Sequence, residues 1–332
     1  MYKQQVNKNS QDTMFEGLLS SALNRAQSTM EQTRKFSSTP STSDQPPPKQ
    51  KQSPNNSDKT KAKSFYKRNP AITSTALAHS LWKEILKPNQ DSAIDATCGN
   101  GHDTLAMAEI LFPHSDNDND NGGENISSIS QLLALDIQEQ ACQSTTKAIQ
   151  EKFGSNILEH NHIEVRQTSH APLPRPSNKS VGLVVYNLGW LPNFNHNTKN
   201  QENKPDKDCI TKVESTLLSL TDAALMIRIG GMISVTTYPT TNPEEDLAVR
   251  VLLECLALLS SNVQTWRDFL DNDESPGSQL SKETVDMIVV AMERIASEGE
   301  SKQTFRVSEH RKLGMVTAPI LLTVIKKTVI VL

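Results

Sequence analysis

The sequence predicts an α/β protein with a mostly parallel sheet and helices on both faces. From about residue 66, apolar segments alternate between a helical and a strand period, which is typical of parallel strands joined by helices. A second observation is the turn that joins the first expected strand to the next helix. It contains Gly99 and Gly101, and glycines there let a ligand approach the backbone closely.

The expected elements follow in chain order. The first helix covers 73–87, where five apolar residues share one stripe and Thr73 or Ser74 can cap the first turn. Further helices are expected over 101–111, 139–153, 213–227 and 243–259. The apolar patterns predict strands over 92–96, 132–137, 162–167, 181–188, 231–238 and 318–327.

The first 65 residues are expected to be a disordered tail and linker that precede a single domain over 66–332. Residues 37–63 are nearly all Ser, Thr, Pro, Gln, Asn, Lys and Asp, a composition with almost nothing to bury. Residues 14–36 can form an amphipathic helix, and residues 1–62 hold nine Lys or Arg against five acids. This composition leaves two interpretations open, an organelle-targeting segment and a solvated tail.

Three polar stretches interrupt the domain, near 114–130, 196–208 and 271–302. Each is expected to be a surface insertion that leaves the sheet intact. The stretch near 114–130 is rich in Asp and Asn, but it lacks the Gly and distal Glu of a calcium loop at the required offsets. No metal is therefore expected there.

Hydropathy, cysteine spacing and net charge limit the classes of protein to which the chain can belong. No apolar run approaches the ~20 residues of a membrane span, so a soluble protein is expected. The four cysteines form neither a zinc pattern nor a disulfide framework, which indicates reduced intracellular thiols. A net charge of -4 and a pI near 6.1 show no general basic character, so any contact with nucleic acid must be a local patch.

The stretch "DATCGNGHDT" predicts a cofactor loop. Asp95 ends the expected strand, and Gly99 and Gly101 place unhindered backbone at the start of the next helix. The third glycine of the dinucleotide fingerprint is absent, so no pyrophosphate is implied. A nucleoside with a cationic tail fits an acidic loop of this kind, and S-adenosylmethionine meets that requirement.

Residues at the ends of two further strands are expected to belong to the same site. Asp136 follows the second strand, where a carboxylate can accept both hydroxyls of a ribose; a solvated acid at a helix start is the alternative. Asn187 ends the fourth strand, with Gly189 and Trp190 close behind. An Asn carbonyl and a backbone carbonyl can hold an uncharged amine in line with a methyl donor, and Trp190 can stack on a base or simply be core.

With these stretches in place, the sequence resembles the "putative rRNA methylase" family of S-adenosylmethionine-dependent methyltransferases. The matching segments are "DATCGNGHDTLAMAEIL", "ALDIQEQA", "TSHA", "YNLGWLPNFN", "TKVEST" and "VTAPILLTVIKK". The resemblance implies a Rossmann-like class I methyltransferase fold with a seven-stranded sheet. It also implies methylation of an aminomethyl group on a modified wobble uridine of tRNA, because bacterial members resemble enzymes with that activity.

The resemblance assigns roles to particular residues. The cofactor residues would be Asp95, Gly99, Asn100, Gly101, Asp103 and Asp136. Asn187, Gly189 and Trp190 would be catalytic, whereas Thr211, Lys212 and Tyr238 would bind the substrate. Lys212 can contact an RNA phosphate or be merely solvated. His102 and His170 can assist proton removal or serve as scaffold.

Two departures from the family pattern bear on recognition of the adenine amine and on the substrate, respectively. Thr168 stands where relatives carry an acid, and the segment after Tyr238 lacks the glycine and histidines of the family. Two other classes of function therefore stay open: a catalytically silent binding module, and a methyltransferase for a small metabolite or protein amine. The sequence also leaves open a homodimer, and either the cytoplasm or an organelle as compartment.

Overall fold

The computed structural model describes residues 73–113, 130–160, 162–177, 180–189, 211–259, 263–299, 303–312, 315 and 317–328. Within the chain, Ser74–Leu332 forms one compact unit. The tail and linker expected over 1–65 lie outside the described residues. So do the insertion at 196–208 and, except for Ser130, the insertion at 114–130.

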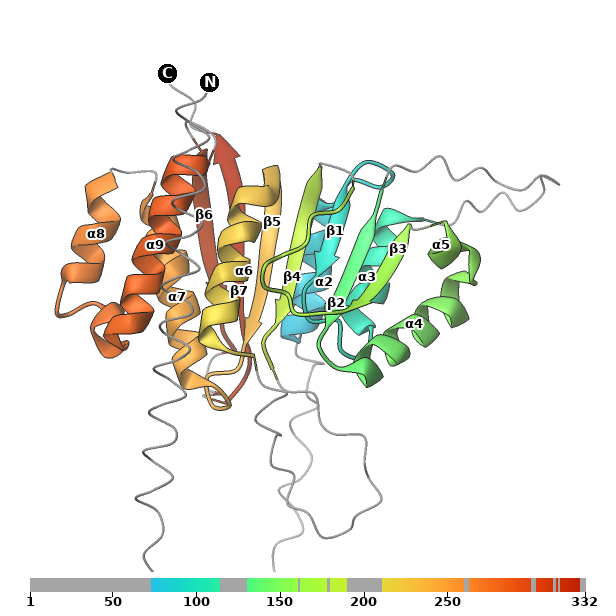
Figure 1. Ribbon diagram of the computed structural model, residues 1–332, viewed down its shortest axis with the longest axis horizontal. Helices are drawn as coiled ribbons and strands as arrows, with labels where there is room; N and C mark the ends of the chain where they lie inside the picture. Colours follow the sequence, from blue (N-terminus) through green and yellow to red (C-terminus); the bar gives the residue numbers. More distant parts are fainter. Residues whose placement is uncertain are drawn as a thin grey trace, which may run out of the picture. The chain divides into compact units, whose positions relative to one another are not determined.

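A mixed sheet forms the centre of this unit (Figure 1). Its strands in the described residues are β1 (Ser92–Asp95), β2 (Leu132–Asp136), β3 (Ile163–Gln167), β4 (Val181–Asn187), β5 (Ile227–Thr237), β6 (Gln303–His310) and β7 (Ile320–Thr328). They lie in the order β3-β2-β1-β4-β5-β7-β6. The first five strands are parallel, and β7 runs antiparallel to both β5 and β6. The expected mostly parallel, seven-stranded α/β fold is confirmed.

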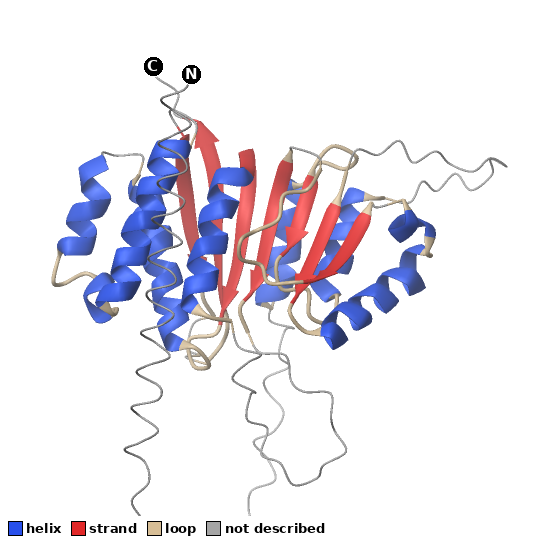
Figure 2. Cartoon of the chain, in the orientation of Figure 1, coloured by secondary structure: helices blue, strands red, loops and turns tan. Residues whose placement is uncertain are grey.

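Helices cover both faces of this sheet (Figure 2). They are α2 (Ser74–Ile85), α3 (His102–Leu111), α4 (Glu139–Phe153), α5 (Asn156–Glu159), α6 (Val213–Met226), α7 (Pro243–Leu258), α8 (Val263–Asp271) and α9 (Lys282–Glu298). Alternate strand residues enter different cores, as Ala93 and Ile94 of β1 illustrate: Ala93 packs with α2 and α3, and Ile94 with α6, α7 and α9. None of the helices in these ranges is long and apolar enough to cross a membrane.

The strand order reverses between β1 and β4, and this reversal positions the site. Strands β2 and β3 follow β1 on one side, whereas β4 and β5 lie on the other. Open α/β sheets bind ligands outside the carboxyl ends of their strands at such a switch point. Asp95, Asp136 and Asn187 are the last residues of β1, β2 and β4, so the order brings three expected site residues to one edge.

The interpretation of 271–302 as a surface insertion is wrong for most of its length. Residues 282–298 form α9, which buries Met287, Ile288, Ala291, Met292 and Ile295 in the core. Ser281 caps this helix by accepting a hydrogen bond from the N–H of Thr284 at 3.2 Å. The charged residues that suggested an insertion occupy the outer face of an amphipathic helix.

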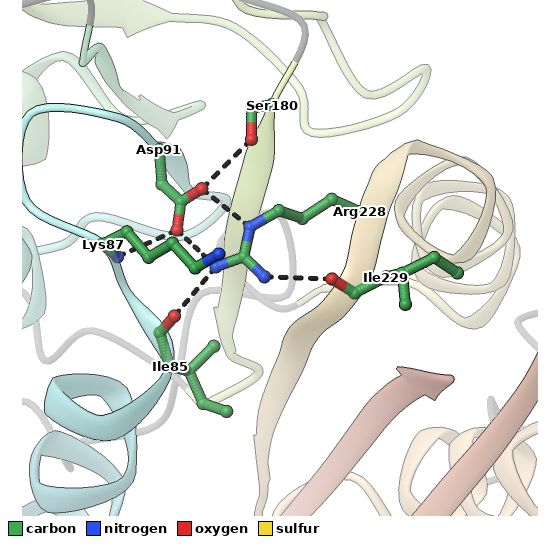
Figure 3. Close-up of polar contacts among 6 residues, drawn as sticks. All are labelled: Ile85, Lys87, Asp91, Ser180, Arg228 and Ile229. Atoms are coloured by element: carbon green, nitrogen blue, oxygen red, sulfur yellow. Dashed lines mark hydrogen bonds and ion pairs between the residues drawn. The ribbon is translucent and has the colours of Figure 1, made fainter. Parts of the chain in front are cut away.

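A buried ion pair fixes the opposite end of the sheet (Figure 3). The guanidinium of Arg228, near the start of β5, donates to both carboxylate oxygens of Asp91, at 2.7 Å from Nε and 2.5 Å from Nη2. Asp91 also accepts from the N–H of Lys87 at 2.9 Å and from the Ser180 hydroxyl at 3.1 Å. Arg228 Nη2 donates to the Ile85 carbonyl at 2.9 Å. These contacts connect the end of α2 with the starts of β1, β4 and β5.

Candidate functional site

A cavity of about 530 Å³ lies at the carboxyl ends of the parallel strands. This volume falls in the range of small-molecule and cofactor sites. Nine of the expected site residues line it: Gly99, Asn100, Asp103, Asp136, Asn187, Gly189, Thr211, Lys212 and Tyr238. Asp95 and Gly101 are not among the lining residues, and Trp190 lies outside the described residues.

The loop between β1 and α3 takes the conformation that its glycines permit. Gly101 precedes α3 with φ of 82°, in the left-handed region that other residues avoid. A Cβ at Gly101 would also lie 3.0 Å from the Cα of Thr145 in α4. Gly101 therefore shapes the loop and allows α4 to approach, whereas Gly99 and Asn100 line the cavity.

Asp95 stabilises the glycine loop through hydrogen bonds. Its buried carboxylate accepts hydrogen bonds from the Thr104 hydroxyl at 2.6 Å and from the N–H of Thr97 at 3.3 Å. Burial raises its pKa to about 7, and the negative charge of Asp103 adds to the rise. The structure thus places Asp95 within the framework of the loop, without the cavity contact that the sequence led us to expect.

Replacing Asp95 with Asn should change how stability depends on pH. The folded protein holds the Asp95 proton more tightly than an unfolded chain, since the usual pKa is 3.8 and the folded value about 7. The stabilisation is full below about pH 4 and is lost as pH rises through about 7. Urea unfolding should show the wild type losing on the order of 1 kcal/mol per pH unit relative to Asp95→Asn between about pH 4 and pH 7, with little further loss at pH 8.

Asp286→Asn removes an exposed acid from α9 and serves as the control. Its unfolding free energy should follow the wild type across this pH range. Parallel curves for wild type and Asp95→Asn would show that the folded state does not bind the Asp95 proton more tightly than the unfolded chain.

Asp136 connects the end of β2 to the glycine loop. Its Oδ2 accepts from the N–H of Gly99 at 3.1 Å, and its Oδ1 accepts from the N–H of Gln138 at 2.9 Å. Burial raises the pKa of this carboxyl group, and the hydrogen bonds oppose the rise. Each carboxylate oxygen can accept a second hydrogen bond. Asp136 lines the cavity beside Ile137, which is 49% exposed and offers an apolar surface to a flat ring.

Asn187 joins the end of β4 to the same loop. Its N–H donates to the Thr97 hydroxyl at 2.7 Å, so the backbone of Asn187 is fixed relative to the glycine loop. The phenol of Tyr238 lies beside it. Burial raises the pKa of Tyr238, the charge of Asp103 adds to this rise, and a hydrogen bond with Asn187 opposes it. Asn187, Tyr238 and Asp103 therefore surround one part of the cavity.

Gly189 is required by the close approach of Tyr238. A Cβ at this position would lie 2.7 Å from Cε2 of the Tyr238 ring, closer than real contacts allow. Gly189 itself lines the cavity. The turn after β4 thus needs glycine so that the ring of Tyr238 can pack directly on its backbone.

Thr211 and Lys212 close the side of the cavity formed by α6. Lys212 immediately precedes the first turn of α6, and its side chain is exposed. The Thr211 hydroxyl lies 2.8 Å from a carboxylate oxygen of Glu245 and 3.4 Å from the carbonyl of Leu188. These contacts bring α6, α7 and the residue after Asn187 together.

Sequence reasoning missed His79. Its Nε2 lies 2.7 Å from Oδ1 of Asp103, and its ring centroid lies 4.7 Å from that of the buried Trp82. Helix α2 thereby orients an acid that lines the cavity. No motif connects residues 24 positions apart on two helices, so the only available signal was a polar residue beside the apolar stripe of α2.

His102 and His170 line the cavity, as their proximity to the motifs suggested. His170 is 7% exposed, and burial lowers its pKa to about 4. Its imidazole is therefore neutral near pH 7. The buried Nε2 of His170 and Oδ1 of Asn100 have no hydrogen-bond partner within the described part of the chain. Thr168 and Ser169 line the same wall.

The features of this cavity fit an adenosyl ligand. The exposed face of Ile137 and the carboxylate of Asp136 are adjacent, as a base and its ribose require. Asn100 contributes a buried carbonyl oxygen that still lacks a donor, and buried polar atoms are normally paired. Asp103 and Asp136 supply negative charge for a cationic tail.

Comparison with known proteins identifies sequence relatives. Residues 132–280 match the family model described as "Putative rRNA methylase", which confirms the resemblance inferred from the sequence. The Arabidopsis thaliana protein named "tRNA (mnm(5)s(2)U34)-methyltransferase, chloroplastic" is 31% identical over 166 residues. That alignment covers 49% of this chain and 52% of the relative, so the chain spans about half the length of the curated relative it matches.

Solved structures with a similar course of the chain include one described as a "putative rRNA-methylase" and one described as an "rRNA methylase". The one from Clostridium thermocellum is 20% identical, with a TM-score of 0.43 over 76% of this chain and 97% of that chain. The one from Streptococcus thermophilus is 15% identical, with a TM-score of 0.42 over 77% of this chain and 97% of that chain.

Proposed function

We propose that this chain is an S-adenosylmethionine-dependent methyltransferase that methylates the aminomethyl group of a modified wobble uridine in tRNA. The cavity supports the proposal, because a single loop is hydrogen-bonded both to Asp136 and to Asn187. The N–H of Gly99 donates to Asp136, and Thr97 accepts from the N–H of Asn187. Asp136 at the end of β2 and Asn187 at the end of β4 are therefore both hydrogen-bonded to the same loop.

The residues divide between two ligands. Gly99, Asn100 and Asp136 would hold the nucleoside of S-adenosylmethionine, with Asp136 accepting from its ribose hydroxyls. Gly101 and Asp95 would keep the loop in shape, and Asp103 would attract a cationic group. When bound, S-adenosylmethionine supplies an activated methyl group on a sulfonium. Asn187, Gly189 and Tyr238 would hold the acceptor amine, with Thr211 and Lys212 contacting the rest of the substrate.

Orientation would provide most of the rate enhancement. The Asn187 side chain can accept a hydrogen bond from an uncharged amine and so direct the nitrogen lone pair. Fixing two reactants in this way contributes up to ~7–11 kcal/mol. No general base is required if the amine enters uncharged, because the proton released after transfer can pass to water.

RNA as the substrate is supported by the description of the matching family model and by the name of the plant relative. The word "chloroplastic" in the name of the plant relative favours an organelle between the two compartments left open by the sequence. The segment after Tyr238, which departs from the family pattern, is the feature that favours a silent binding module or a different amine substrate.

A labelled-methyl assay tests the proposal. The full chain is incubated with methyl-labelled S-adenosylmethionine and total small RNA, and the RNA is then digested and analysed by nucleoside mass spectrometry. Label in a methylaminomethyl-uridine supports the proposal. Transfer only to metabolites or protein, offered in parallel incubations in place of RNA, contradicts the RNA substrate. Heat of cofactor binding without transfer to any acceptor contradicts the enzyme.

Asp136→Asn should weaken cofactor binding without unfolding the protein. A hydrogen bond to a charged group contributes about 1.5–3 kcal/mol, so loss of the charge should raise the Kd of S-adenosylmethionine about 10- to 100-fold by calorimetry. Glu139→Gln, which removes an exposed acid three residues later, is the matched control and should leave the Kd unchanged. An unchanged Kd in Asp136→Asn would exclude Asp136 from the cofactor site.

A further inference from the structure

Helix α7 carries a buried carboxylate whose hydrogen-bond donors within the described residues are all neutral. Glu245, in the first turn of α7, is 1% exposed. Its carboxylate accepts from the hydroxyls of Thr211 at 2.8 Å and Thr216 at 2.7 Å, and from Nδ2 of Asn242 at 3.1 Å. Burying a carboxylate costs free energy unless it is well hydrogen-bonded. The three donors offset this cost only if they keep their positions around Glu245.

The donors come from the segments that form the substrate side of the cavity. Thr211 lines the cavity and also contacts the carbonyl of Leu188, the residue after Asn187. Asn242 ends the turn that begins at Tyr238, where its N–H donates to the Tyr238 carbonyl at 3.1 Å. Nδ2 of Asn242 also donates to the Thr211 carbonyl at 3.2 Å. Glu245 thus contacts the residues that connect the carboxyl ends of β4 and β5 with the start of α6.

A neighbouring acid in the same turn of α7, Asp246, is bonded to residues that do not line the cavity. Asp246 is 2% exposed. It accepts from the Thr237 hydroxyl at 2.6 Å and pairs with Arg250 at 2.8 Å. Neither of these partners lines the cavity. Two consecutive acids in one turn are therefore buried alike, but only Glu245 contacts the cavity wall.

We propose that Glu245 is a positioning residue that holds Thr211 and the Tyr238 turn in the arrangement that receives the acceptor. The inference rests on the proposed function and deepens it, because it adds to the substrate side a residue that does not line the cavity. Glutamine at this position keeps the shape but presents an NH₂ group to three donors. At least one of those donors then loses its acceptor, and the cavity wall around Thr211 becomes more mobile.

Steady-state kinetics of Glu245→Gln and Asp246→Asn test the proposal, with total small RNA and labelled S-adenosylmethionine as substrates. Glu245→Gln should lower kcat/KM for RNA about 10-fold, the effect of one unpaired buried donor, mainly by raising KM. The Kd of S-adenosylmethionine should stay within about twofold of wild type by calorimetry, because Glu245 does not contact the cofactor side. Asp246→Asn should leave both quantities near wild type when assayed below its melting temperature.

Hydrogen–deuterium exchange separates this proposal from the proposed function, because it needs no substrate. Amides of 211–216 and 238–242 should exchange faster in Glu245→Gln than in Asp246→Asn. Equal exchange in the two variants, or equal losses of activity that follow their melting temperatures, would overturn the positioning role. Absence of label transfer by the wild type would contradict the proposed function and leave the exchange result to decide the role of Glu245.

Discussion

Asn187→Ala is expected to lower kcat for methyl transfer by about 100- to 1,000-fold, the usual effect of removing a group that orients the reacting atoms. The backbone of Asn187 is held by Thr97, so the loop should keep its position in the variant. The missing side chain is the group that neighbours Tyr238 at the cavity wall. The Kd of S-adenosylmethionine should therefore change only a few-fold by calorimetry.

The matched control is Asn156→Ala, which truncates an exposed Asn in α5. It should leave both kcat and the cofactor Kd at wild-type values. If Asn187→Ala lost cofactor binding and turnover to the same extent, Asn187 would belong to the cofactor site, and the division between the two sides of the cavity would be wrong.

Arg228→Met is expected to cost about 3–5 kcal/mol of unfolding free energy, because it leaves the buried Asp91 carboxylate without its cation. Burial alone would raise the pKa of Asp91, but the hydrogen bonds and charge of Arg228 hold it below its usual value. This stabilisation is present above the usual pKa near 3.8 and is lost as pH falls further. Urea unfolding at pH 7 measures the loss directly.

Two variants show whether burial causes the effect. Arg166→Met breaks a half-exposed pair with Glu164 and should cost at most about 1 kcal/mol. Adding Asp91→Asn to Arg228→Met should restore part of the stability, since the neutral amide needs no cation. If the losses in Arg228→Met and Arg166→Met were similar, the buried pair would not be what fixes this end of the sheet.

Strand and helix periodicity predicted most of the fold. The expected helix over 139–153 coincides with α4, and six expected strands lie within a few residues of the observed ones. β6 was not found from periodicity, because Gln303 and Phe305 are its only buried residues and the others resemble a polar loop. Helix α9 was missed although its buried residues recur at helical spacing, because charged residues separate them.

The site was predictable where one short motif carries both the geometry and the chemistry. The glycine loop, Asp136 and Asn187 are of this kind, since each follows an apolar strand. His79 and Glu245 could not be found, because their roles depend on contacts between distant helices and no local pattern marks them. Asp95 shows another limit of prediction from sequence. The sequence predicts that Asp95 lies at the glycine loop, but only the packing of the folded chain determines the direction of its carboxylate.

The inner position of β7 has a consequence for synthesis of the chain. β6 is made before β7, yet its sheet pairing in the described residues is with β7 alone. Lys326, near the end of β7, donates to the carbonyls of Ala224 and Leu225 in the last turn of α6. A ribosome-bound chain that stops before residue 320 would therefore hold β6 unpaired and leave the edge of β5 open to other nascent chains.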